Sequence, residues 1–142
     1  MPKGGPIMNI DLTEKEFRRL LDMVYIGNWI LNSARGDDRF GDYDDVESLL
    51  FSYCAAAGMP NLAEILCDEV VPSKAFIEGG IHEAIMDYED SIFYDILAEE
   101  LARRDMALEN VSPDDNEDLM YRMENYITEF EAHGMENLKV EN

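Results

Sequence analysis

Apolar side chains recur three and four residues apart along most of this chain, which is the spacing of one face of an α-helix. No stretch of useful length alternates between apolar and polar residues as a half-buried strand does. Residues 70–71 and 138–140 are the only places where a short strand could form, and no internal repeat is visible. The pattern predicts an all-α fold, a compact single-domain bundle of five or six helices.

Start and stop signals place the first helices along the chain. Thr13 followed three residues later by Glu16 is a capping box, so the first helix is expected from there to about residue 34. We expect a second helix from Asp44 or Asp45 to residue 58, and a short third helix over 61–69 that ends before Pro72. Residues 73–80 are expected to form a helical turn broken by the glycines at 79 and 80.

The second half of the chain carries two further helix patterns. Apolar residues from 81 to 108 lie along one stripe, which predicts either one long helix or two helices with a kink near Asp90. Ser112 and Pro113 mark another start, because serine caps a helix and proline loses nothing at the first helical position. His133 and Gly134 are the expected stop, where a histidine opposes the helix dipole.

Length and composition are those of one globular domain. The chain has 142 residues, of which 46% are hydrophobic, and this is enough to bury a core. We expect a flexible leader over residues 1–9, a helical domain over 10–134 and a C-terminal tail over 135–142. Neither a secretory signal nor an apolar run of about 20 residues is present, which predicts a cytoplasmic protein. Cys54 and Cys67 stand among apolar neighbours and are expected to be buried, reduced thiols.

The charge balance excludes several classes of partner. There are 32 Asp and Glu residues against 11 Lys and Arg, which gives a formal net charge of −21. Direct binding to nucleic acid needs cations that displace counterions from phosphate, and binding to anionic lipid needs them as well. We therefore expect no direct nucleic-acid partner and no membrane partner.

The densest acidic segment is residues 83–118, with 13 carboxylates against two arginines. Such a segment is often only a solvated face, and halophilic adaptation would also produce it. A surface of one sign can instead steer and select a partner of the opposite sign. The residues expected to bind such a partner are Asp87, Glu89, Asp90, Asp95, Glu99, Asp114 and Asp115. The sequence thus favours a non-catalytic acidic interaction module that docks on a basic protein surface, and it leaves homo-oligomerisation open.

Catalytic and metal-binding patterns find little support, so we expect no enzyme and no cofactor. The two histidines, His82 and His133, lack the Glu-x-x-His spacing of di-iron bundles. The acidic loop over residues 37–47 fails as an EF-hand, because an arginine stands at its third position and glycine at its fifth. Two alternatives stay open: a metal-dependent enzyme that uses bundle carboxylates and His82, and a nucleic-acid-mimicking inhibitor of a basic nucleic-acid-binding protein.

Three segments carry a resemblance to known sequences. They are IDLT at 10–13 leading into YIGNW at 25–29, FYDILAEELARRD at 93–105, and the close of the chain over 126–138. In this order they resemble a family of small acidic all-α bacterial proteins with no assigned function. The resemblance implies a bacterial single-domain protein and transfers no functional residue.

Overall fold

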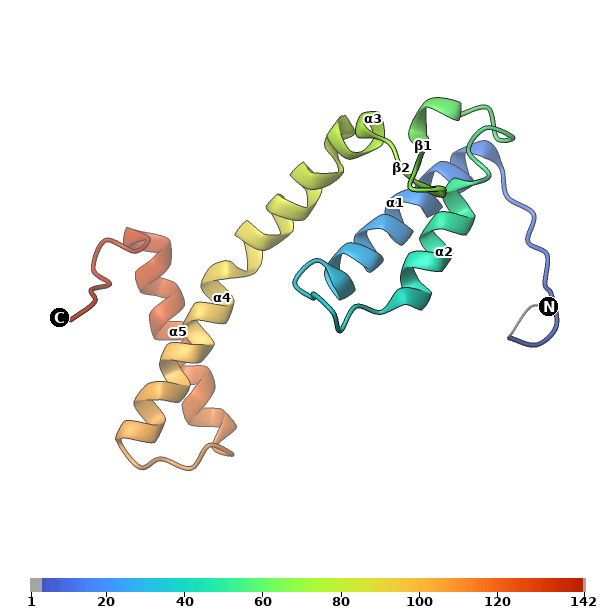
Figure 1. Ribbon diagram of the computed structural model, residues 1–142. Helices are drawn as coiled ribbons and strands as arrows, with labels where there is room; N and C mark the ends of the chain where they lie inside the picture. The colour runs from blue at the N-terminus through green and yellow to red at the C-terminus, as the bar shows by residue number, and fades with distance from the viewer. Residues whose placement is uncertain (1–3, 142) are drawn as a thin grey trace. The chain divides into compact units, whose positions relative to one another are not determined.

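A computed structural model describes residues 4–141 of the chain (Figure 1). Within them the fold is mostly helical, with one small sheet. The elements in chain order are α1 (Glu14–Asn32), α2 (Gly41–Phe51), the 3-10 turn η1 (Pro60–Leu62), β1 (Ala63–Leu66), β2 (Glu69–Pro72), α3 (Lys74–Phe76), the π-helical segment η2 (Ile77–Ile81), α4 (His82–Leu108) and α5 (Asn116–His133). The helical fold is therefore confirmed in outline, whereas the predicted bundle of five or six helices is wrong.

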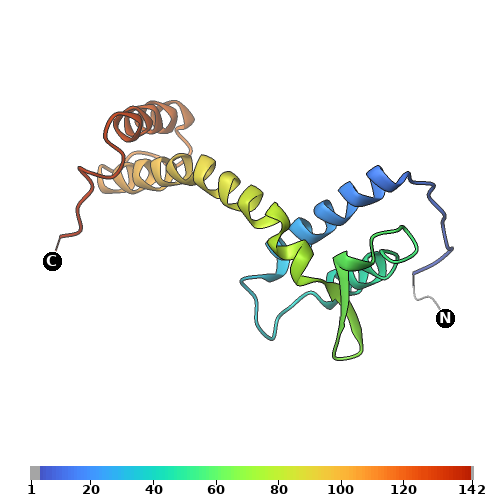
Figure 2. The same ribbon diagram turned by 90° about the horizontal axis from the view of Figure 1, so that it is seen from above.

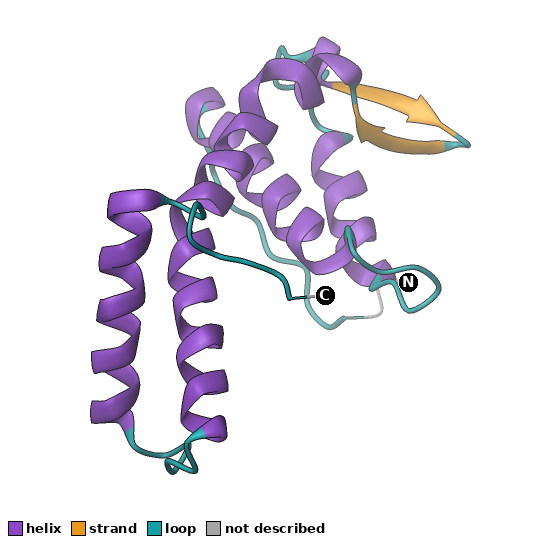
Figure 3. Ribbon diagram, turned by 90° about the vertical axis from the view of Figure 1, so that its left-hand side faces the viewer, coloured by secondary structure: helices purple, strands orange, loops and turns teal. Residues whose placement is uncertain are grey.

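The β1–β2 hairpin replaces the helix that the sequence predicts over residues 61–69 (Figure 3). The strands are antiparallel, with Ala63 opposite Pro72 and Leu66 opposite Glu69. Cys67 and Asp68 link them with φ of 51° and 64°, the left-handed pair that a two-residue hairpin turn requires. A short apolar run suits a strand as well as a helix, and here the turn between the two strands decides.

Contacts divide the chain into two compact units, Met1–Ala84 and Ile85–Asn142, which we call unit 1 and unit 2. The division falls in the first turn of α4. Each unit has its own cluster of buried apolar residues. The division into a flexible leader (1–9), a helical domain (10–134) and a C-terminal tail (135–142) stays a prediction.

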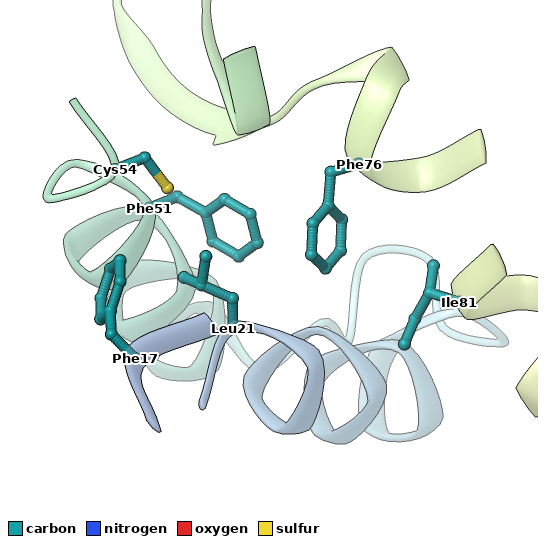
Figure 4. Packing of buried hydrophobic residues seen from close by; sticks show 6 residues of the cluster. All are labelled: Phe17, Leu21, Phe51, Cys54, Phe76 and Ile81. Atoms are coloured by element: carbon teal, nitrogen blue, oxygen red, sulfur yellow. The ribbon is translucent and has the colours of Figure 1, made fainter. Parts of the chain in front are cut away.

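The core of unit 1 forms where α1, α2 and the chain after the hairpin meet (Figure 4). The rings of Phe51 and Phe76 meet edge to face with centroids 5.0 Å apart. Around them pack Phe17 and Leu21 from α1, with Cys54 and Ile81. The hairpin positions Phe76 in this core. β2 leads directly into Ser73, and the Ser73 hydroxyl caps α3 by accepting a hydrogen bond from the Phe76 N–H.

Local signals account for some of the helix ends in unit 1. The predicted capping box is confirmed, since Glu16 N–H donates to the Thr13 hydroxyl and Thr13 N–H to the Glu16 carboxylate. The predicted break at the paired glycines is also confirmed, because Gly80 has a φ of 110° that only glycine adopts readily. The second helix, in contrast, begins at Gly41 and ends at Phe51, earlier at both ends than predicted, and turns follow to residue 58.

The two cysteines differ in their surroundings, and both are free thiols. Cys54 is buried in the unit 1 core, as predicted. The prediction for Cys67 is wrong, because this residue is exposed at the tip of the hairpin, which projects from the rest of unit 1 (Figure 2). Its apolar neighbours Ile65 and Leu66 are exposed with it, so apolar neighbours in sequence did not indicate burial.

Unit 2 is a helical hairpin in which α5 runs antiparallel beside the C-terminal half of α4 (Figures 1 and 3). Its core consists of Ala102, Met106 and Leu119, with Val111, Met123 and Tyr126 packed against them. Of the two predicted alternatives for residues 81–108, one continuous helix from His82 is observed. Gly134, with φ of 57°, ends α5 as predicted.

The start of α5 lies later than the serine–proline pair suggests. Asp115 is its N-cap and accepts a hydrogen bond from the Asp118 N–H at 3.1 Å, so the helix begins at Asn116. Ser112 forms a turn with the same segment, since Asp115 N–H donates to its carbonyl. Ser112 and Asp115 can both cap a helix, and the prediction that Ser112 caps α5 is wrong.

Shortening a core side chain tests the packing of unit 1. Leu21 is fully buried, so Leu21→Ala removes buried methyl groups and leaves a cavity. We expect the free energy of unfolding to fall by about 2–5 kcal/mol in urea denaturation. Met23→Ala, on the same helix but 70% exposed, is the matched control and should change it by less than about 0.5 kcal/mol. Equal effects of the two substitutions would contradict this core.

Candidate partner-binding surface

Five of the predicted acidic residues lie on α4, but they do not share one face. Asp87, Glu89, Asp90 and Asp95 are exposed and Glu99 is half-buried. At 100° of rotation per residue, Asp87 and Asp90 lie on one side of the helix, Asp95 and Glu99 on a second, and Glu89 on a third. The carboxylates therefore surround α4 and form no focused patch.

The other two predicted residues, Asp114 and Asp115, lie in the connection between α4 and α5. Both are exposed, and the Asp115 side chain caps α5. Between Asp87 and the end of α4 the helix rises about 30 Å at 1.5 Å per residue. Asp114 and Asp115 thus lie at the opposite end of α4 from Asp87. The seven predicted residues do not form a single site.

The three arginines of unit 2 are all engaged by carboxylates of the same unit. Arg103 pairs with Glu99 at 2.8 Å, and Arg104 pairs with Asp105 at 2.8 Å. Arg122 bridges Asp118 and Glu109. Within residues 4–141, no ion pair forms at Asp87, Glu89, Asp90, Asp95 or Asp114. Unit 2 carries 17 carboxylates against four cations, so most of its negative charge is uncompensated.

The carboxylate of Asp105 links α4 to α5 and so is not part of the uncompensated charge. The Tyr126 hydroxyl on α5 donates to its carboxylate, and Arg104 donates to the same group. Burial acts to raise the pKa of Asp105, but these hydrogen bonds outweigh burial and lower it. Asp105 therefore stays ionised at neutral pH and is occupied inside the protein.

Apolar residues on α4 occupy two opposite faces. Ala98, Ala102 and Met106 are buried on the side that packs against α5. On the other side, a shallow groove of about 300 Å³ runs along the helix surface. Its lining residues, which we call the outer stripe, are Glu89, Ile92, Phe93, Ile96, Leu97 and Glu100. Ile92, Ile96 and Leu97 belong to the single apolar stripe predicted over residues 81–108, and the structure places them away from the face of α4 that packs against α5.

A buried polar network in unit 1 was not anticipated. Asn28 and Asn32, one turn apart on α1, are both buried. The Asn32 side-chain amide donates to Asn28 Oδ1 at 2.7 Å and to the Phe40 carbonyl at 3.1 Å, and Phe40 N–H donates to Asn32 Oδ1 at 2.7 Å. These bonds hold the loop after α1 against the helix. Two asparagines four residues apart in an apolar helix were the available signal.

The same network occupies part of the acidic loop over residues 37–47. Asn28 donates to Asp44 at 2.9 Å and to Glu47 at 3.1 Å. Arg39 forms two parallel hydrogen bonds to Asp44, at 2.7 and 2.8 Å. These contacts, with the hydrogen bond from Arg39 first, lower the pKa of Asp44, whereas burial raises the pKa of Glu47. Asp44 and Glu47 of this segment thus serve the internal packing of unit 1.

His82 contacts aromatic side chains, not carboxylates. Its Nε2 lies 2.6 Å from the Tyr25 hydroxyl, and its ring meets the Trp29 ring edge to face at 5.8 Å. His133 Nδ1 lies 3.2 Å from Glu129 on the exposed last turn of α5. Over residues 4–141, no three His, Cys, Asp or Glu side chains are grouped so as to hold a metal ion. The metal-enzyme alternative therefore has no observation in its favour.

Replacing Glu47 by glutamine tests the electrostatics of the polar network. The folded-state pKa of Glu47 is raised above its usual 4.5, so its contribution to stability is lost as pH rises through the raised value. Glu47→Gln removes this ionisation and should make the protein more stable than wild type at neutral pH, with the gain vanishing in acid. Urea unfolding from about pH 4, below the usual pKa of glutamate, to about pH 8 measures it. The exposed Glu64→Gln is the control, and an equal gain there would contradict the assignment.

Comparisons with known proteins add no relatives. The chain matches no family model, no curated protein and no solved structure. The resemblance to small acidic bacterial proteins stays a prediction. Over residues 4–141, none of the helices combines the length and apolarity that a membrane span requires.

Proposed function

We propose that this protein is a non-catalytic acidic interaction module that docks on a basic protein surface through unit 2. The observation that carries the proposal is the uncompensated charge of that unit. Its arginines are paired internally, while Asp87, Asp90 and Asp95 on α4 form no ion pair with any residue that the structure describes. We further propose that it acts in the bacterial cytoplasm.

Charge of one sign on an exposed helix favours a partner of the opposite sign. Carboxylates around α4 attract Lys and Arg clusters approaching from several directions, which raises the rate of encounter more than the final affinity. At physiological salt the field extends about 8 Å from the surface, so the interaction should weaken as salt rises. Because the carboxylates surround the helix, specificity must come from another feature of the surface.

Two alternative functions are a metal-dependent enzyme and a nucleic-acid-mimicking inhibitor. A metal-dependent enzyme would need ligands brought together around His82, whose contacts are with Tyr25 and Trp29. A nucleic-acid mimic would need carboxylates in rows that follow two phosphate backbones, and those of α4 are spread around one helix. Neither is favoured by a specific observation, and the acidic docking module is the function that the residues support best.

Affinity capture with charge variants tests the proposal. The full chain is immobilised, and proteins retained from a bacterial extract at low and high salt are identified by mass spectrometry. The triple variant Asp87→Asn, Asp90→Asn, Asp95→Asn should retain at least tenfold less of each basic partner than the wild type does. The reason is that it removes three unpaired charges from α4. The matched control is Asp11→Asn, Asp37→Asn, Asp45→Asn in unit 1, where the residues are also exposed.

The expected partners have basic surfaces, elute as salt rises and are retained by the control triple variant. Retention that is independent of salt, or lost equally with both triple variants, would contradict docking through unit 2. Circular dichroism of each variant verifies that the helices are kept.

A further inference from the structure

The outer stripe of α4 is an apolar surface that the described residues of unit 2 leave largely exposed. α5 covers only the opposite face, where the alanines and Met106 are buried. On the outer stripe, Phe93 is 46% exposed and Ile96 is 53% exposed, with Ile92 and Leu97 half-buried beside them. A helix that is apolar on two faces is typical of one that packs against neighbours on both sides.

The stripe has the dimensions of a helix-binding groove. Its members stand at positions i, i+3, i+4, i+7, i+8 and i+11, which lie along one side of a helix. They span about 16 Å of helix, or three turns. Apolar residues at this spacing on a second helix would fit between them as ridges into grooves.

Carboxylates close both ends of the stripe. Glu89 precedes its first apolar residue and Glu100 follows its last. The nearest cations on α4, Arg103 and Arg104, are paired with Glu99 and Asp105. A ligand that fills the groove therefore meets apolar side chains in the middle and negative charge at each end.

We propose that the outer stripe binds an amphipathic helix of a partner protein, with apolar residues at a spacing of three and four and Lys or Arg at both ends. The inference rests on the proposed function and specifies where and how the basic partner docks. Phe93 and Ile96 are the anchors, since a large exposed aromatic or aliphatic side chain at the centre of a groove dominates such interfaces. Glu89 and Glu100 select basic ends and set the position of the partner along α4.

A second copy of this chain fits the groove poorly. In an antiparallel pairing centred on the stripe, Glu89 of one copy lies beside Glu100 of the other, and in a parallel pairing identical glutamates meet. Like charges placed together in a partly desolvated interface oppose association. The 17 carboxylates of unit 2 add long-range repulsion between copies.

The probe is a synthetic helical peptide of about five turns, with leucines at a spacing of three and four and lysines at both ends. A control peptide has the same composition with the leucines distributed around the helix. Binding of each to the full chain is measured by fluorescence anisotropy at low and physiological salt. We expect the amphipathic peptide to bind at least tenfold more tightly than its control, because only it can fill the groove.

Two pairs of variants locate the binding. Phe93→Ser with Ile96→Ser should weaken binding at least tenfold, whereas Met120→Ser with Tyr121→Ser, also exposed but on α5, should leave it within twofold. Glu89→Gln with Glu100→Gln should reduce both the affinity and its salt dependence. Glu124→Gln with Glu131→Gln, exposed on α5, is the matched charge control. All eight positions are outside the buried core, and circular dichroism verifies each fold.

The outcomes separate this inference from the proposed function. Equal, salt-sensitive binding of both peptides, unaffected by the serine variants, would overturn the groove while leaving a basic partner on the acidic surface. Failure of the amphipathic peptide to bind would also overturn the groove, and the capture experiment then decides the proposed function independently. A wild-type dimer in sedimentation that the stripe variant abolishes would show that a second copy covers the stripe, and would overturn the inference as well.

Discussion

Packing between α4 and α5 is the interaction on which unit 2 depends. Small side chains at Ala98 and Ala102 let the helices approach, and Met106 fills the space beside Leu119. Because α5 is the only long helix packed along this part of α4 within unit 2, it covers one face and leaves the other exposed. The outer stripe is thus a direct consequence of a two-helix arrangement.

The charges of unit 2 follow the same geometry. Two carboxylates at the C-terminal end of α4 bind side chains of α5. Asp105 accepts hydrogen bonds from Tyr126 and from its neighbour Arg104, and Glu109 pairs with Arg122. Glu99 pairs with Arg103 along α4, whereas within residues 4–141 Asp87, Glu89, Asp90 and Asp95 form no ion pair and lie around the helix that carries the apolar stripe. An apolar groove within a negative field is a combination that attracts a basic partner at long range and can discriminate among partners on contact.

Unit 1 shows which features could be predicted and which could not. The Thr13–Glu16 capping box and the glycine break at Gly80 were read correctly, because each depends on residues close in sequence. The hairpin was missed, because its apolar run suits either structure and the left-handed turn at Cys67 and Asp68 lacks the usual glycine. The Asn28–Asn32 network was missed as well, since its partners belong to the loop and to α2.

Helical content, the Thr13–Glu16 capping box and the excess of negative charge were determined by the sequence itself, because periodicity, local capping and composition act locally or sum over the chain. Tertiary structure alone decided which apolar face of α4 is buried. It also decided which carboxylates are paired and where Cys67 and His82 lie. The physical reason is that burial and ion pairing depend on which distant segments come together, and a helix with two apolar faces does not indicate which of them its neighbour will cover.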